Sequence, residues 1–210
     1  MKSFDNHKFD FKIYRKELIE FKSLLDSKDE LSENDDILPF FRKKKHLSSQ
    51  IATIVSTKVI ETDKIAQEFD LFSDFASDMA IGDSKNNIYC FIEFEDAKKH
   101  SLFKKNGAKY KPEYSNRLEH GLSQVIDWFY KLEGQQNTDA MEERFGKHKI
   151  EYEGILIIGR TKYLNTSTKR RLNWRNRNVV INSKHVNCYT FDELYETLNT
   201  KLYLLEKLAE

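Results

Sequence analysis

Three acidic side chains lie in or beside two short apolar segments, where carboxylates are uncommon. Asp78 stands inside segment 75–81, and Glu93 and Glu95 follow segment 88–92. Side chains two residues apart on a strand share a face, so Glu93 and Glu95 point to one side. If the two segments pair, Asp78 lies near Glu93. Converging carboxylates repel one another unless a cation lies between them, and Mg²⁺ or Mn²⁺ suits such oxygen ligands.

The same residues have a simpler interpretation, in which residues 93–96 are the solvated end of a strand. That interpretation is sufficient for a single glutamate. It explains less well why acids accompany both apolar segments, because burying an unpaired carboxylate is costly. We therefore favour a metal site formed by Asp78, Glu93 and Glu95.

A β-hairpin must bring these acids together, and the chain has the pattern of one. Residues 82–87 (GDSKNN) are rich in turn-forming types, and residues 88–92 (IYCFI) are aromatic and β-branched, as in a buried strand. The segment 75–81 would form the partner strand. The hairpin therefore predicts that the acids meet at one end of a small sheet.

A helix with a strong apolar stripe is predicted over residues 115–132. Gln124 and Trp128 are four residues apart and share one face of it, which we assign to its more polar side. Glu119 and His120 lie on that side as well. A lone histidine is more often structural than catalytic, and His120 is the histidine that we single out for its position near the acidic hairpin.

The remaining pattern predicts an α/β fold with a mixed central sheet flanked by helices. The continuous apolar run 153–160 is typical of a strand buried on both faces. An accessory segment is expected over residues 1–38, before a domain over residues 39–210. The other predicted elements are strands over 9–13, 179–182 and 186–190, a loop over 26–36, and helices over 14–25, from Pro39, over 164–176 and over 191–209.

Composition excludes several classes of protein. The chain has 210 residues, is 39% hydrophobic and carries a net charge of +1, which fits one ordered domain and neither favours nor excludes nucleic acid. No Walker or dinucleotide-binding glycine motif occurs, and no apolar run is long enough to span a membrane. Cys90 and Cys188 lie in apolar segments and are expected to be reduced. We therefore expect a cytoplasmic protein.

A basic loop follows the acidic hairpin. Its lysines would suit contacts with the phosphates of a nucleic acid, and a surface loop without a partner is an equally good interpretation. The lysines are Lys104, Lys105, Lys109 and Lys111.

The order of helix, acidic hairpin, glutamine-bearing helix and buried strand resembles the PD-(D/E)xK nuclease superfamily. In that superfamily an Asp and a Glu on adjacent strands bind Mg²⁺, and a Lys two residues after the Glu supports the attacking water. Asp78 and Glu93 match the two acids, and Gln124 with Trp128 resembles the QxxxY helix motif. The resemblance implies a restriction-endonuclease-like fold.

Longer segments are similar to the Shedu family of anti-phage defence nucleases, over about residues 39–205. That resemblance implies a metal-dependent enzyme that nicks or cleaves double-stranded DNA and assembles as a homo-oligomer. The N-terminal region of such proteins varies and often senses or regulates, so sensing here would depend on a partner or on the nuclease domain itself. The segments are DFASDMAIGDSKNNIYCFIEFEDAK, RLEHGLSQVIDWFYKL, EGILIIGR, RLNWR and TFDELYETL.

One position departs from the superfamily pattern, because Glu95 stands where the motif has lysine. A carboxylate cannot stabilise the scissile phosphate as an ammonium would, so we expect Glu95 to be a further metal ligand or a base, and Lys98 to restore the positive charge. Gln124 would orient the site, with Glu119 and His120 supporting it.

Two other hypotheses remain open. The chain could be a catalytically inactive nuclease-fold module for DNA binding or assembly, or an unrelated sheet domain that serves as a protein-interaction scaffold. The scaffold hypothesis predicts no binding of Mg²⁺.

Overall fold

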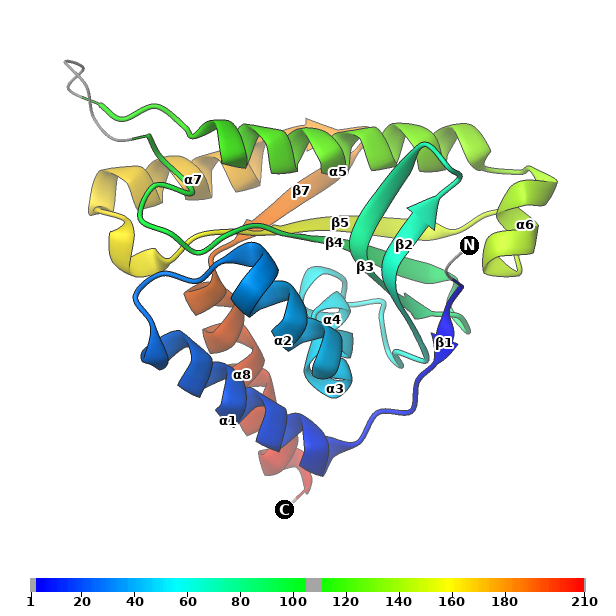
Figure 1. The fold of residues 1–210 in the computed structure, drawn as a ribbon. Coiled ribbons are helices and arrows are strands. Elements are labelled where there is room, and N and C mark those ends of the chain that lie inside the picture. Colours follow the sequence, from blue (N-terminus) through cyan, green and yellow to red (C-terminus); the bar gives the residue numbers. More distant parts are fainter. Residues whose placement is uncertain (1–2, 105–110, 210) are drawn as a thin grey trace.

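A mixed β-sheet runs through the computed structural model, which describes residues 3–104 and 111–209 (Figure 1). Its strand order is β1-β2-β3-β4-β5-β7-β6. The first four strands pair antiparallel, β4, β5 and β7 pair parallel, and β6 returns antiparallel. This confirms the predicted α/β fold with a mixed central sheet. The strands are β1 (Asp5–Asn6), β2 (Lys64–Leu71), β3 (Phe75–Asp83), β4 (Ile88–Phe94), β5 (Glu151–Ile157), β6 (Val180–Ile181) and β7 (Lys184–Tyr189).

Helices cover both sides of the sheet (Figure 1). The side that we call the α5 face carries α5 (Asn116–Gln135), α6 (Asp139–Phe145) and α7 (Thr166–Asn178). The opposite side, the α1 face, carries α1 (Phe11–Ser27), α2 (Leu38–Lys43), α3 (Lys45–Ser49), α4 (Ala52–Val55) and α8 (Phe191–Ala209). A short π-helix η1 (Glu33–Ile37) precedes α2, and a 3₁₀ turn η2 (Thr161–Tyr163) precedes α7.

Successive residues of β4 alternate between these two faces. Cys90 and Ile92 belong to the core of the α1 face, whereas Tyr89 and Phe91 belong to the core of the α5 face. Because side chains two apart share a face, Glu93 follows Tyr89 and Phe91. The sheet therefore places this acid beneath α5.

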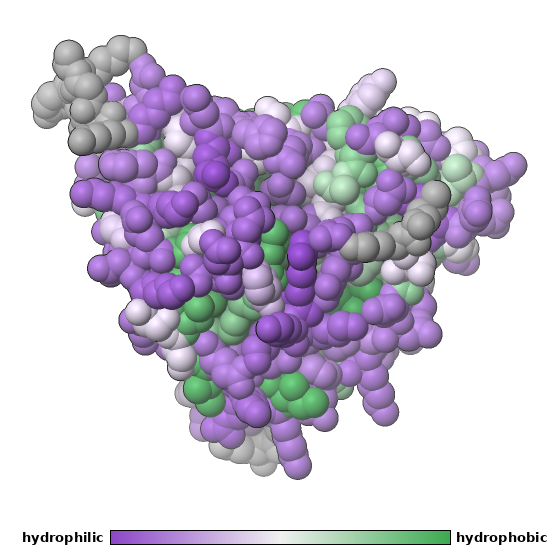
Figure 2. Space-filling view, viewed as in Figure 1, coloured by the Kyte–Doolittle hydropathy of each residue, from purple (hydrophilic) through white to green (hydrophobic). Residues whose placement is uncertain are grey.

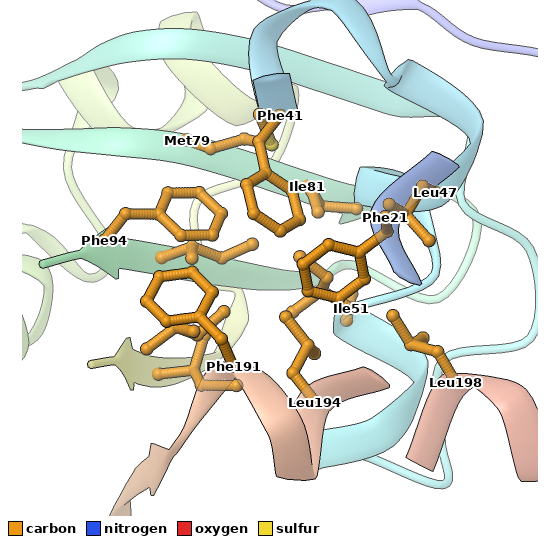
Figure 3. Close-up of a cluster of buried hydrophobic side chains, with 14 of the residues drawn as sticks. Phe21, Phe41, Leu47, Ile51, Met79, Ile81, Phe94, Phe191, Leu194 and Leu198 are labelled. Carbon is orange, nitrogen blue, oxygen red and sulfur yellow. The ribbon is translucent and has the colours of Figure 1, made fainter. Parts of the chain in front are cut away.

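An aromatic stack on the α1 face holds the backbone beside that acid. The ring centroids of Phe41 and Phe94 are 4.4 Å apart, and those of Phe94 and Phe191 are 6.5 Å apart with nearly parallel planes (Figure 3). These rings come from α2, β4 and α8. Since Phe94 directly follows Glu93, its burial fixes the end of β4 from the side opposite the acids.

Most predicted elements are present, and the hairpin, α5 and α8 lie where the pattern put them. The strand predicted over residues 9–13 is wrong, because α1 begins at Phe11. Asp10 Oδ1 accepts hydrogen bonds from the backbone N–H groups of Lys12 and Ile13 at 2.8 and 3.0 Å, which caps the helix. The loop predicted over residues 26–36 is partly wrong, since η1 begins at Glu33.

Three further differences concern helices and one strand. The helix predicted from Pro39 is divided into α2, α3 and α4, and β2 was not predicted as a strand. Trp128 was assigned to the polar side of its helix, and this is wrong. Its side chain is only 1% exposed and packs in the core of the α5 face.

The N-terminal segment packs into the same core as the rest of the chain. α1 lies against α8, and the hydroxyl of Tyr14 donates a hydrogen bond to the Leu198 carbonyl at 2.8 Å. The division at residues 38 and 39 stays a prediction.

The surface carries polar residues with scattered apolar ones. Apolar residues gather only in separate patches on the face shown in Figure 2. Among the described residues, no helix is long and apolar enough to cross a membrane.

Gly154 lets α5 lie close to β5. A Cβ at this position would fall 2.4 Å from Val125 Cγ1 and 2.8 Å from Phe129 Cε1. We expect Gly154→Ala to lower the free energy of unfolding by about 1–3 kcal/mol, measured by urea denaturation, because α5 must move off the sheet. Gly134→Ala is the control. Nothing lies within 4 Å of a Cβ there, so it should stabilise the helix by about 0.5–1 kcal/mol. Equal stability of Gly154→Ala and the wild type would contradict this packing argument.

Candidate active site

Asp78 and Glu93 are neighbours on adjacent strands. Met79 of β3 pairs with Ile92 of β4, so the antiparallel register places Asp78 opposite Glu93. The backbone N–H of Phe94 donates a hydrogen bond to Asp78 Oδ2 at 2.8 Å. The structure thus brings the two predicted acids together, with Glu93 only 8% exposed.

Burial and mutual repulsion make both acids hard to ionise. Burial, followed by the charges of Asp78, Glu95 and Glu33, raises the pKa of Glu93 to about 9, and a hydrogen bond from Gln124 acts in the opposite direction. Burial is also the main cause that raises the pKa of Asp78 to about 6, and the bond from the Phe94 backbone opposes it. Without a cation, the pair therefore retains one proton near neutral pH, and Glu93 is the acid that keeps it.

Gln124 completes this arrangement from α5. Its Oε1 is buried and has no hydrogen-bond partner among the described residues. A buried acceptor without a partner is costly, and a cation would satisfy it. Carboxylate and amide oxygens are ligands that a hard divalent ion accepts. Asp78, Glu93 and Gln124 therefore fit Mg²⁺ or Mn²⁺ in donor type and charge.

The predicted set of three metal ligands is not already assembled. Within residues 3–104 and 111–209, no group of three or more His, Cys, Asp or Glu side chains is arranged to hold a metal ion. Glu95 is buried, and it forms an ion pair with Arg117 from the first turn of α5. Burial raises the pKa of Glu95 to about 7, although Arg117 opposes the shift.

Sequence reasoning missed two members of this site, Arg117 and Glu33. Arg117 Nη1 lies 2.9 Å from Glu33 Oε2, and Arg117 Nε lies 3.4 Å from Asp96 Oδ2. One signal for Arg117 was present, since positions 117, 121 and 124 have the i, i+4, i+7 spacing of a single helix face. Glu33 lies in a segment that was predicted to be a linker, and its sequence context gives no comparable signal.

Two of the other predicted side chains pair with residues outside the acid pair. Lys98 Nζ pairs with Asp96 at 3.4 Å rather than with Glu93. Glu119 takes two hydrogen bonds from Arg175 of α7, at 2.6 and 2.8 Å, and so joins α5 to α7. His120 is exposed to solvent.

The basic loop is described only at its ends. Lys104 pairs with Glu113 at 3.7 Å, and Lys111 is exposed. Lys105 and Lys109 lie outside the described residues. A cavity of about 360 Å³ is lined in part by Lys98, Lys99, His100, Lys104 and Arg160, and Lys98 also pairs with Asp96.

Comparison with known proteins identifies one family. The family model described as Shedu protein SduA, C-terminal, matches residues 30–195. This range includes every acid described above, from Glu33 to Asp96, as well as Arg117 and Gln124. No curated protein matches the chain.

Replacing Glu93 by Gln should stabilise the metal-free protein at high pH. The folded-state pKa of Glu93 is about 9, well above its ordinary value. Below an ordinary carboxyl pKa of about 4.3 the group is protonated in both states, so burial carries no ionic penalty. As the pH rises from about 4.3 towards about 9, the Glu93 carboxyl ionises first in the unfolded state, so the free energy of unfolding falls. We expect Glu93→Gln to gain about 1–3 kcal/mol at pH 8 and little at pH 4, measured by unfolding in EDTA.

The control for this prediction is Glu61→Gln. Glu61 is exposed between α4 and β2, so its replacement should leave the pH dependence of unfolding unchanged. A Glu93→Gln variant that is less stable than the wild type at pH 8 would contradict the conclusion that an ionised Glu93 destabilises the folded protein.

Proposed function

The chain belongs to the Shedu SduA C-terminal family, a component of anti-phage defence, and we propose that it is a metal-dependent deoxyribonuclease. It would nick or cleave phosphodiester bonds of double-stranded DNA. The observation that supports this most is the buried pair of Asp78 and Glu93, next to the unsatisfied amide oxygen of Gln124. Such a pair is costly in a protein that never binds a cation.

Each residue of the site has a role in this proposal. Asp78 and Glu93 hold Mg²⁺ or Mn²⁺, and such an ion, when bound, polarises a phosphate and makes water more nucleophilic. Gln124 orients Glu93 by its hydrogen bond. Glu95 serves as a further ligand or as the base that accepts a proton at a carboxylate oxygen, and its pKa of about 7 suits the second role.

Basic side chains that follow the acids in the chain support DNA as the substrate. Carboxylates alone would repel the phosphate backbone, and the cavity lined by Lys98, Lys99 and Lys104 offers ammonium groups to offset that charge. Lys105, Lys109 and Lys111 would extend this contact along the loop. Glu119 and His120 would support the site from α5.

Assembly and regulation are part of the same proposal. We propose that the chain assembles as a homo-oligomer. A regulatory partner or the nuclease domain itself would sense infection. We propose that the protein acts in the cytoplasm.

One observation favours a second function, which is DNA binding or assembly without cleavage. No lysine follows Glu93 by two residues, and Glu95 at that position is engaged by Arg117. A site without a cation beside the phosphate would bind the substrate without catalysing its hydrolysis.

Cleavage of supercoiled and linear DNA in Mg²⁺, Mn²⁺ or EDTA separates these functions. We expect the wild type to nick or cut only with metal. Glu93→Ala should slow this at least about 100-fold, because it removes a ligand of the ion. Glu61→Ala, distant from the acids, should cut at the wild-type rate.

Two results would count against the enzyme. DNA binding without cutting under every metal would favour the second function. Metal-dependent cutting that persists in Glu93→Ala would show that the acids described here are not the catalytic ones.

A further inference from the structure

Negative charge accumulates where a DNA phosphate would have to lie. Five carboxylates lie close enough to act on Glu93 or Glu95 or to be one of that pair, from Glu33, Asp78, Glu93, Glu95 and Asp96. A phosphodiester brought against this group adds one more negative charge, so a resident cation is needed in addition to any metal. Arg117 is placed to be that cation.

We infer that Arg117 supplies the positive charge that faces the scissile phosphate, and that Glu95 holds it in position. This inference rests on the proposed nuclease function. It gives Glu95 a positioning role, exerted through Arg117, in addition to the role of metal ligand or base proposed above.

Three acidic residues from two segments converge on the Arg117 guanidinium. Glu33 comes from η1, and Glu95 and Asp96 are consecutive residues that follow β4. Arginine presents several donors in a rigid plane, so one guanidinium can bind more than one acceptor at once. These contacts hold the Arg117 guanidinium against the carboxylate of Glu95, the residue that stands two positions after Glu93.

The packing of α5 explains how this helix reaches Glu95. Gly121 lies one turn beyond Arg117, and a Cβ there would be 2.7 Å from Leu156 Cδ1 and 3.5 Å from Glu95 Cγ. The absence of a side chain lets the helix axis approach β5 and Glu95. The same face then carries Gln124 to Glu93, so one helix delivers both the amide and the guanidinium.

Arg117 retains a donor for a substrate. Its Nη1 is engaged by Glu33 and Glu95, and its Nε faces Asp96. In the part of the chain that the structure describes, Nη2 has no acceptor, and the side chain is 42% exposed. An exposed amino group on an oriented guanidinium is suited to a phosphate oxygen.

Lys98 is the alternative source of charge, and its contacts are weaker. Its ammonium lies 3.4 Å from Asp96 Oδ2, and no ion pair joins it to Glu93 or Glu95 among the described residues. The side chain is also more exposed, so it is less well fixed. A single ion pair at this distance, made by a half-exposed lysine, contributes little orientation.

The test compares Arg117→Met, which removes the charge and keeps much of the side-chain length, with Arg117→Lys, Lys98→Met and the control Arg15→Met. Arg15 is an exposed residue of α1 that pairs with Glu206. Two quantities are measured for each variant. One is kcat and KM for cleavage with Mg²⁺, and the other is the salt dependence of binding to a short DNA duplex with Ca²⁺ in place of Mg²⁺.

We expect Arg117→Met to lower kcat about 100-fold or more, with KM changed by less than about 5-fold. The salt slope, which is the slope of the logarithm of the binding constant against the logarithm of the salt concentration, should fall in magnitude by about one unit, because one phosphate contact is lost. Arg117→Lys should keep the slope and recover part of kcat, since it keeps the charge but not the planar geometry. Arg15→Met should match the wild type in both.

The two measurements separate this inference from the nuclease proposal. A wild type that binds the duplex but never cuts it would contradict the nuclease proposal. The salt slope of binding would still report the contact between Arg117 and a phosphate. An unchanged slope in Arg117→Met, or a larger loss in Lys98→Met, overturns the inference. Should Arg117→Met fail to fold, as judged by its melting temperature, a slope in Arg117→Lys that falls by one unit also overturns it.

Discussion

Crowding of like charges at the ends of β3 and β4 is the constraint on which this structure depends. Glu93 is buried beside Asp78, and burial together with neighbouring carboxylates raises the pKa of both acids, although the charge of Arg42 opposes the shift at Asp78. Hydrophobic packing on both faces of the sheet must hold the strands together against that repulsion. The Phe41–Phe94–Phe191 stack does so from the α1 face. The fold is thereby less stable than it would be without these acids, and it keeps a site ready to bind a positively charged ligand.

The α5 helix places polar side chains around the crowded acids. Gly121 and Gly154 remove side chains from its contact with β5, so the helix lies close enough for Gln124 and Arg117 to reach the acids. Glu119 then joins the same helix to α7 through Arg175. A rigid element that is fixed at several points can orient polar groups more precisely than a loop can.

The sequence predicts the parts of the site that depend on local pattern. The predicted hairpin brought Asp78 near Glu93, and the resemblance to the QxxxY helix motif singled out Gln124, which helical spacing alone had put on the more polar side of its helix. It could not predict the Arg117–Glu95 pair, because nothing in either segment states which charges meet in space. Glu33 was missed for the same reason. Local capping by Asp10 overrode the strand-like alternation of residues 9–13, and tertiary burial overrode the polar assignment of Trp128.

The Arg117–Glu95 ion pair also limits how this site can change during evolution. Replacing Glu95 by lysine alone would set two cations against each other, and replacing Arg117 alone would leave a buried carboxylate unpaired. The two positions are therefore epistatic, so that each residue is tolerated only in the presence of the other. A lineage that exchanges a strand lysine for a helix arginine must pass through a destabilised intermediate or change both residues together.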